Sequence, residues 1–195
     1  YAEKYPTEAA ELKRRFDGTL PEGWDKDLPT FTSKDAAAAT RITSGNVLNH
    51  FAKKIPELFG GSADLNPSCF TYLKTDKDYL KGHFGERNVR FGVREHAMAA
   101  ICNGLNAYGA IIPFCSTFLN FIGYAYGAVI LSALSGHQVL YVFTHDSIYL
   151  GEDGPTHQPI EKYLTCRGTP NLHFWRPADA NETVATYVSA IRSRH

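Results

Sequence analysis

The chain has 195 residues, which is enough for one domain with a substantial hydrophobic core and an additional arm. Its 20 lysines and arginines equal its 20 aspartates and glutamates, so the charge gives no reason to expect nucleic acid or a membrane surface as a partner. No apolar run reaches the roughly 18 residues of a membrane-spanning helix, and the four widely spaced cysteines favour reduced thiols over a disulfide framework or a zinc site.

The first part of the chain differs from the rest. Residues 1–16 carry the charge pattern of a solvated helix, and Pro21 and Pro29 then interrupt any regular element. We therefore predict that residues 1–32 form a connector that arrives from a preceding domain. Because the chain begins with Tyr1, and no signal peptide is visible, we expect a piece of a longer polypeptide or a processed form.

From residue 33 onward, short apolar strands alternate with helices. The pattern predicts strands over residues 57–64 (running into a glycine-rich turn), 89–93, 110–115, 139–143 and 172–175. It predicts helices over residues 36–54, 94–108, 117–134, 159–166 and 181–192, and a loop over residues 65–85. This alternation over roughly 160 residues predicts an α/β fold, a doubly wound parallel sheet with helices on both faces.

Polar side chains recur where the predicted strands end. They are Asp64, Glu95, Ser116, Thr117, His145 and Arg176. In open parallel sheets, ligands bind in the crevice beyond the carboxyl ends of the strands. We therefore expect side chains from several strands to converge on one edge of the sheet and form a site there.

Glu95 stands out because it lies where a predicted strand ends and a predicted helix begins. Its carboxylate is expected to face both the positive end of the helix and the low dielectric of a crevice. The alternative is a glutamate that merely suits the helix dipole. The aromatic residues Phe118, Phe121 and Tyr124 recur every three positions on the next helix, which is typical of core packing. Since that helix begins at the same edge, an aromatic ligand slot is the competing interpretation.

Several common chemistries have no motif in the chain. GxGxxG, the Walker A motif and the GxSxG nucleophile elbow are all absent. His145, Asp146, Asp153 and His157 are possible metal ligands by type, but their spacing matches no zinc signature. The sequence therefore predicts no metal site within the chain.

A set of segments, taken together, resembles transketolase. They are residues 60–65 (GGSADL), 91–98 (FGVREHAM), 117–121 (TFLNF), 144–148 (THDSI), 151–159 (GEDGPTHQP) and 175–179 (WRPAD). They occur in the family's order and spacing over about residues 33–195. The resemblance identifies residues 33–195 as the pyrimidine-binding (Pyr) domain of a thiamine-diphosphate enzyme, truncated at its carboxyl end, with the thiamine-diphosphate-binding fold.

The resemblance implies a transferase of the pentose phosphate pathway that moves a two-carbon ketol unit from a ketose phosphate to an aldose phosphate through thiamine diphosphate. It implies catalytic roles for Glu95, which hydrogen-bonds the ring nitrogen of the aminopyrimidine, and for His157. The implied cofactor-binding residues are Asp64, Glu95, Phe118, Phe121 and Tyr124. The implied substrate-binding residues are Arg41, Ser68, His145, Asp153 and His157. For Arg41 and Ser68, an exposed helix arginine and an ordinary loop serine stay open as alternatives.

The chain departs from the family pattern at a few positions. Cys115 and Ser116 stand where two glycines are common, Ile130 where a basic residue is common, and Tyr149 where glycine is usual. These departures leave the donor and acceptor preference open. A dihydroxyacetone synthase-type paralogue is therefore an alternative, and a non-catalytic stand-alone interaction module is another.

The resemblance also implies what lies outside this chain. The family's diphosphate and metal site is in its first domain, so ligands for Mg²⁺ or Ca²⁺ are expected elsewhere. In the family this domain faces the diphosphate-binding domain of the other subunit, which implies a homodimer. We expect sugar phosphates as substrates, no nucleic acid or membrane partner, and no activity from the fragment alone. The expected location is cytoplasmic, with plastid or peroxisome as alternatives.

Overall fold

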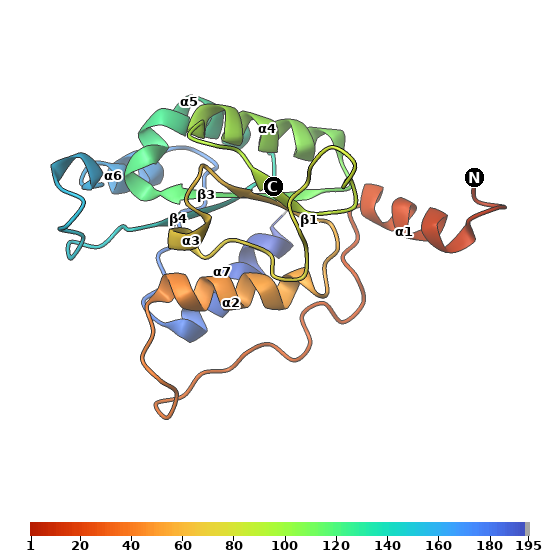
Figure 1. Ribbon diagram of the computed structural model, residues 1–195, viewed down its shortest axis with the longest axis horizontal. Helices are drawn as coiled ribbons and strands as arrows, with labels where there is room; N and C mark the ends of the chain where they lie inside the picture. The colour runs from red at the N-terminus through yellow and green to blue at the C-terminus, as the bar shows by residue number, and fades with distance from the viewer. Residues whose placement is uncertain (194–195) are drawn as a thin grey trace.

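The computed structural model describes residues 1–193, which form a parallel sheet covered by helices on both faces (Figure 1). The strands are β1 (Leu58–Ser62), β2 (Asn88–Arg90), β3 (Ile112–Phe118) and β4 (Leu140–Thr144), in the order β2-β1-β3-β4. All neighbouring strands are parallel. The chain turns from β1 to β2 in one direction and then crosses back to β3, so the crevice of an open α/β sheet is expected at the carboxyl ends of β1 and β3.

The helices lie in two layers. They are α1 (Pro6–Phe16), α2 (Thr40–Ala52), α3 (Asn66–Cys69), α4 (Glu95–Tyr108), α5 (Ile122–Leu134), α6 (Lys162–Gly168) and α7 (Ala180–Arg192), with 3₁₀ turns at Leu119–Phe121 and Pro155–His157. Helices α4 and α5 pack together on one face of the sheet, and α2 and α7 on the other (Figure 1). The predicted doubly wound α/β fold is confirmed.

Hydrophobic clusters on both faces of the sheet hold these layers together. One joins α2 and α7 to the sheet through Leu48, Phe51, Phe114 and Ile191, all fully buried. A second lies between the sheet and α4, α5 and α6, and a third joins Met98 and Cys102 of α4 to Cys115 of β3. Glycines in β1 permit the strands to come this close, because a Cβ added at Gly60 would overlap the carbonyl oxygen of Phe114 in β3.

The prediction of a long helix over residues 117–134 is wrong for its first five residues. Strand β3 continues to Phe118, and α5 begins only at Ile122, after a 3₁₀ turn. Ser116 and Thr117 had the residue types of helix caps. Both are instead fully buried in β3, where the hydroxyl of Ser116 lies 2.5 Å from Thr71 Oγ1 and donates to the carbonyl oxygen of Gly61.

The helix predicted over residues 36–54 begins at Thr40, because the preceding alanines are exposed and have no core to cover. The short helix α3 lies in the segment predicted to be a loop. Strand β2 ends at Arg90, three residues earlier than predicted. Helix α7 begins close to its predicted start, with the side chain of Asp179 accepting a hydrogen bond of 2.8 Å from the backbone N–H of Glu182.

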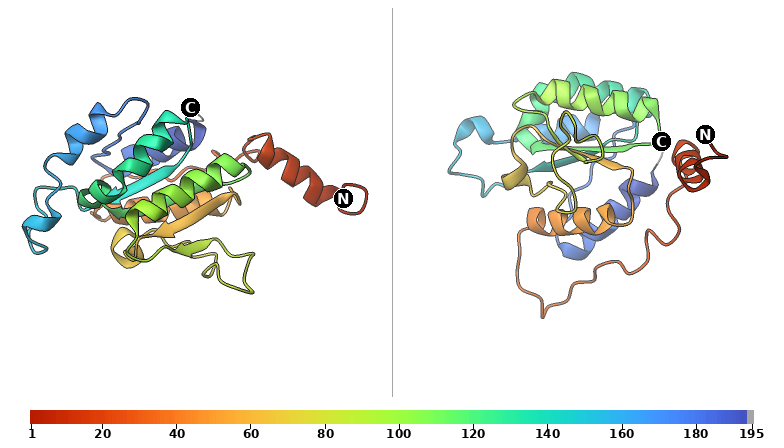
Figure 2. Two further views of the ribbon diagram at one scale, coloured as in Figure 1. Left: turned by 90° about the horizontal axis from the view of Figure 1, so that it is seen from above. Right: turned by 45° about the vertical axis from the view of Figure 1, so that its right-hand side comes forward.

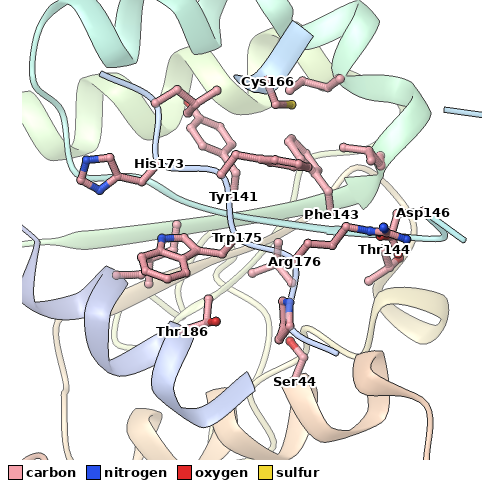
Figure 3. A pocket seen from close by; sticks show the side chains of 18 of the residues that line it. Ser44, Tyr141, Phe143, Thr144, Asp146, Cys166, His173, Trp175, Arg176 and Thr186 are labelled. Atoms are coloured by element: carbon pink, nitrogen blue, oxygen red, sulfur yellow. The ribbon is translucent and has the colours of Figure 1, made fainter. Parts of the chain in front are cut away.

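The strand predicted over residues 172–175 does not join the sheet. Within the described residues β4 is the last strand on its side, and a cavity of about 630 Å³ separates it from residues 171–177. Figure 3 shows Tyr141 and Phe143 of β4 on one side of this cavity and Trp175 on the segment across it. The apolar residues that suggested a strand are present, but within residues 1–193 they pair with no other strand.

Helix α1 projects from the body of the molecule (Figure 2) and contacts it through a partly buried ion pair and through the ring of Phe16, which meets Tyr108 of α4 edge-on. The guanidinium of Arg14 donates to both carboxylate oxygens of Glu57, at 2.8 and 3.0 Å. Glu57 is only 5% exposed, just before β1, and Arg14 also donates to Glu11 at 2.7 Å. Hydrogen bonds to the two arginines Arg14 and Arg15 lower the pKa of Glu11 to about 2.

We predict that Arg14→Met lowers the free energy of unfolding by about 1–3 kcal/mol, because it leaves the buried Glu57 carboxylate without its partner. Urea unfolding of the four proteins of a double-mutant cycle, with Glu57→Gln as the second change, measures this coupling. The double variant should lose less than the sum of the two single losses. Additive losses would contradict a pairwise role for this contact.

Candidate functional site

Four aromatic rings are stacked in series at the carboxyl edge of the sheet. The ring of His145 lies 3.6 Å from that of Phe118 at an interplanar angle of 24°. Phe118 stacks on Phe121 at 5.9 Å and 13°, and Phe121 stacks on Tyr124 at 5.9 Å and 22°. His157 meets Phe121 edge-on at 5.0 Å. Since Phe118 is buried and Tyr124 is 68% exposed, the series runs from the core to the surface.

The elements that position these rings differ from the single helix that was predicted. Phe118 ends β3, Phe121 ends the 3₁₀ turn, and Tyr124 lies in the first turn of α5. The spacing of three residues nevertheless brings the rings into series. A flat aromatic face of this kind suits a planar ligand, although aromatic pairs are also common in cores.

His145 follows the last residue of β4 and is held from three sides. Its Nε2 lies 2.8 Å from Nη1 of Arg41, which is in the first turn of α2. Its Nδ1 lies 2.8 Å from Oγ1 of Thr144, and its ring packs on Phe118. The backbone φ of His145 is 55°, a left-handed conformation that turns the chain sharply after the strand.

Burial lowers the pKa of His145, and the positive charge of Arg41 lowers it further. The carboxylates of Asp153 and Asp146 act in the opposite direction but do not reverse the shift. His145 is therefore held in its neutral form to a lower pH than an exposed histidine.

Arg41 and Ser68 are neighbours, but not through the serine hydroxyl. Nη1 of Arg41 lies 3.5 Å from the backbone carbonyl oxygen of Ser68, at the limit of a hydrogen bond. The guanidinium also lies 5.8 Å from the centre of the Phe70 ring. The alternative of a fully exposed Arg41 does not hold, since its side chain contacts α3 and the loop after β4.

The loop after β4 brings His157 and Asp153 to the same edge. The carbonyl oxygen of Thr156 accepts a hydrogen bond from the side-chain amide of Asn120, which ties this loop to the 3₁₀ turn. Nδ1 of His157 lies 2.9 Å from the hydroxyl of Thr156, and the ring is half-buried against the aromatic series. Asp153 is exposed and acts on His145 through its charge.

Asp64 and Glu95 lie at the ends of neighbouring strands. Asp64 is exposed, with a left-handed φ of 63° after β1. Glu95 is half-buried and is the first residue of α4, where the helix N-terminus favours a negative charge. Within residues 1–193, neither carboxylate has a side-chain hydrogen bond, so both are available to a ligand.

A buried polar layer beneath the site was missed at the sequence level. Oγ1 of Thr144 lies 3.3 Å from Sγ of Cys69, and the Thr71 hydroxyl donates to Asn66 and contacts Ser116. The signal was available in part, because hydroxyls in a fully buried strand must find partners. What the sequence did not give was the approach of α3 to the ends of β3 and β4.

Within residues 1–193, no group of three or more histidine, cysteine, aspartate or glutamate side chains is arranged to hold a metal ion. In the same part of the chain, no helix is long and apolar enough to cross a membrane.

The comparison with known proteins gives consistent matches. The family described as "Transketolase, pyrimidine binding domain" matches residues 36–195. Transketolase 2 of Saccharomyces cerevisiae is 55% identical over 199 residues, covering 99% of this chain and 29% of that protein. A chloroplastic transketolase of Craterostigma plantagineum is 53% identical over 194 residues, covering 99% of this chain and 37% of the relative.

A crystal structure of a transketolase from Pichia stipitis, in complex with sedoheptulose 7-phosphate, superposes with a TM-score of 0.95 at 55% identity. The match covers 100% of this chain and 30% of that one. This chain therefore spans about a third of the length of the relatives it matches.

We predict that an NMR titration of His145 has its midpoint below the ordinary value of 6.5, and that Arg41→Met raises it. Because the unfolded chain binds this proton more readily, the stability contributed by neutral His145 is present above pH 6.5 and is lost as the pH falls through the folded-state pKa. Urea unfolding of the wild type and His145→Gln across this range measures the loss. A midpoint above 6.5 would contradict the assignment.

Proposed function

Since this chain belongs to the transketolase family through its pyrimidine-binding domain, we propose that it carries part of the active site of a transketolase. The proposed reaction transfers a two-carbon ketol unit from a ketose phosphate to an aldose phosphate with thiamine diphosphate as cofactor. The observation that carries the proposal is the stacked series of rings from His145 to Tyr124 at the carboxyl edge of the sheet.

The described residues fit the pyrimidine half of this cofactor. The aromatic series offers a face that is open to solvent at Tyr124, and the hydroxyl of Thr117, next to Phe118, is buried without a hydrogen-bond partner in residues 1–193. A planar heterocycle with polar ring atoms suits such surroundings. When bound, thiamine diphosphate supplies the carbon nucleophile that takes up the two-carbon unit.

We assign the cofactor contacts as follows. Phe118, Phe121 and Tyr124 hold the pyrimidine ring, with Phe121 as the stacking partner. Glu95 shares a proton with a ring nitrogen, a role that its half-buried position without a competing side-chain partner supports. Asp64 serves as an acidic contact near the cofactor at a subunit interface, for which its exposure leaves it free.

The substrate contacts that we propose lie around the inner end of the aromatic series, at His145. His145, through the Nε2 that also accepts from Arg41, and Asp153 hydrogen-bond substrate hydroxyls. His157 helps to receive the donor and acts in catalysis. Arg41 binds the phosphate end, since a guanidinium suits phosphate oxygens. Ser68 contributes to the same end, although its carbonyl oxygen already faces Arg41.

We further propose that Mg²⁺ or Ca²⁺ and the diphosphate are held by residues outside this chain. The complete enzyme is then a homodimer, in which this domain faces the diphosphate-binding domain of the other subunit. We propose a cytoplasmic location, and the chloroplastic relatives make a plastid the competing one.

We predict that Glu95→Gln, in the transketolase that contains this chain, lowers turnover by roughly 10²–10⁴-fold while it weakens cofactor affinity far less. The amide cannot share a proton as the carboxylate does. Steady-state kinetics and cofactor titration measure the two effects, with Glu22→Gln, an exposed glutamate in the loop after α1, as the matched control. Near-normal turnover would remove Glu95 from the mechanism.

We also predict that the 195-residue chain alone binds thiamine diphosphate poorly and has no transketolase activity. An aromatic stack contributes on the order of 1 kcal/mol beyond area burial, whereas immobilising a ligand costs at least about 4 kcal/mol. Isothermal titration with magnesium and the cofactor tests this expectation. Micromolar binding would show that a complete cofactor site lies within these residues.

A further inference from the structure

A chain of hydrogen bonds leads from the buried polar layer to the edge of the site. Sγ of Cys69 lies 3.3 Å from Oγ1 of Thr144, which lies 2.8 Å from Nδ1 of His145. Nε2 of the same ring lies 2.8 Å from Nη1 of Arg41. Cys69 and Thr144 are 0% and 6% exposed, so the inner end of this chain is shielded from water.

The chemistry of the groups allows only one direction for these bonds. A guanidinium has donors and no acceptor, so Nε2 of His145 must be the acceptor from Arg41. The proton of the neutral ring is therefore on Nδ1 and is donated to Oγ1 of Thr144. The hydroxyl of Thr144 then has its own hydrogen free to donate to the sulfur of Cys69.

The surroundings of the ring favour this neutral tautomer. A protonated His145 would set an N–H against an N–H of Arg41, and burial disfavours the second positive charge. The other charged or titratable groups that act on His145 are Asp146, Asp153 and His157 of the loop after β4. Stacking on Phe118 fixes the plane of the ring.

The outer end of this chain of hydrogen bonds is the guanidinium of Arg41, which uses only some of its donors. Nη1 of Arg41 meets both His145 and the carbonyl oxygen of Ser68. Within residues 1–193, Nε and Nη2 of Arg41 have no hydrogen-bond partner. Because His145 holds one nitrogen in place, the direction of the remaining donors is fixed, and an anion that meets them finds a preorganised site.

We propose that Thr144 is a positioning residue. With Cys69 behind it, Thr144 holds His145 as the Nδ1–H tautomer, and this tautomer orients Arg41 toward the anionic end of the substrate. The part concerning substrate rests on the proposed function, whereas the tautomer is a property of this chain alone. Thr144 itself does not touch the substrate.

The first test is the tautomer. Long-range ¹⁵N–¹H NMR of the 195-residue chain near pH 8, with His145 identified by His145→Gln, distinguishes the two neutral forms. The wild type should show the Nδ1–H form, and Thr144→Ser should keep it. In the isosteric Thr144→Val, Nδ1–H has no acceptor, so the ring should give up its bond from Arg41 and change to the Nε2–H form. An Nε2–H form in the wild type, or an unchanged tautomer in Thr144→Val, would overturn the proposal. If the valine variant does not fold, the wild-type spectrum alone tests the tautomer.

The second test is kinetic and uses the complete enzyme. Thr144→Val should raise the KM for a ketose phosphate about tenfold. This factor corresponds to the loss of one well-placed hydrogen bond between Arg41 and the phosphate. The KM for the same ketose without its phosphate should change much less. Thr144→Ser should restore the wild-type ratio of the two KM values. An equal rise for both substrates would overturn the role of Thr144 in orienting Arg41. A wild-type enzyme without transketolase activity would instead refute the proposed function and leave the tautomer result standing.

Discussion

The burial of β3 along its whole length is the constraint on which the rest of the structure depends. Every residue from Ile112 to Phe118 is buried, and both neighbours are parallel strands. The register places Phe118 opposite Thr144, so the next residue, His145, comes to lie on the Phe118 ring. The contact between His145 and Phe118, the inner end of the aromatic series, therefore follows from strand pairing.

Burying the end of β3 has a consequence for polar groups. Ser116 lies in the sheet interior, where an unpaired hydroxyl would cost about 1–3 kcal/mol. Its partners are Thr71, in the segment after β1, and the carbonyl oxygen of Gly61, in β1 itself. The same segment supplies Cys69 to Thr144. The short helix α3 is thus held against the ends of β3 and β4, beneath the residues that we assign to the substrate.

The layer architecture and the edge that carries the site could be predicted from the sequence, because hydrophobic periodicity and polar strand ends are local signals. The beginning of α5 could not, since Ser116 and Thr117 look like helix caps unless the buried partners are known. The prediction of a strand at residues 172–175 was wrong for the opposite reason. Its residues suit a strand, but a strand also needs a neighbouring strand to pair with. The link from Cys69 to His145 depends on tertiary contacts between segments far apart in sequence.

The two sides of the site are held with unequal rigidity. On one side, Phe118, His145 and Arg41 are fixed by the sheet, by α2 and by the buried polar layer. On the other, residues 151–157 are mostly exposed and are attached through the bond from Asn120 to Thr156. Rigid elements hold functional groups more accurately than loops do. We therefore expect the fixed side to recognise the phosphate of the proposed sugar-phosphate substrates, and the loop side to decide which sugar is accepted.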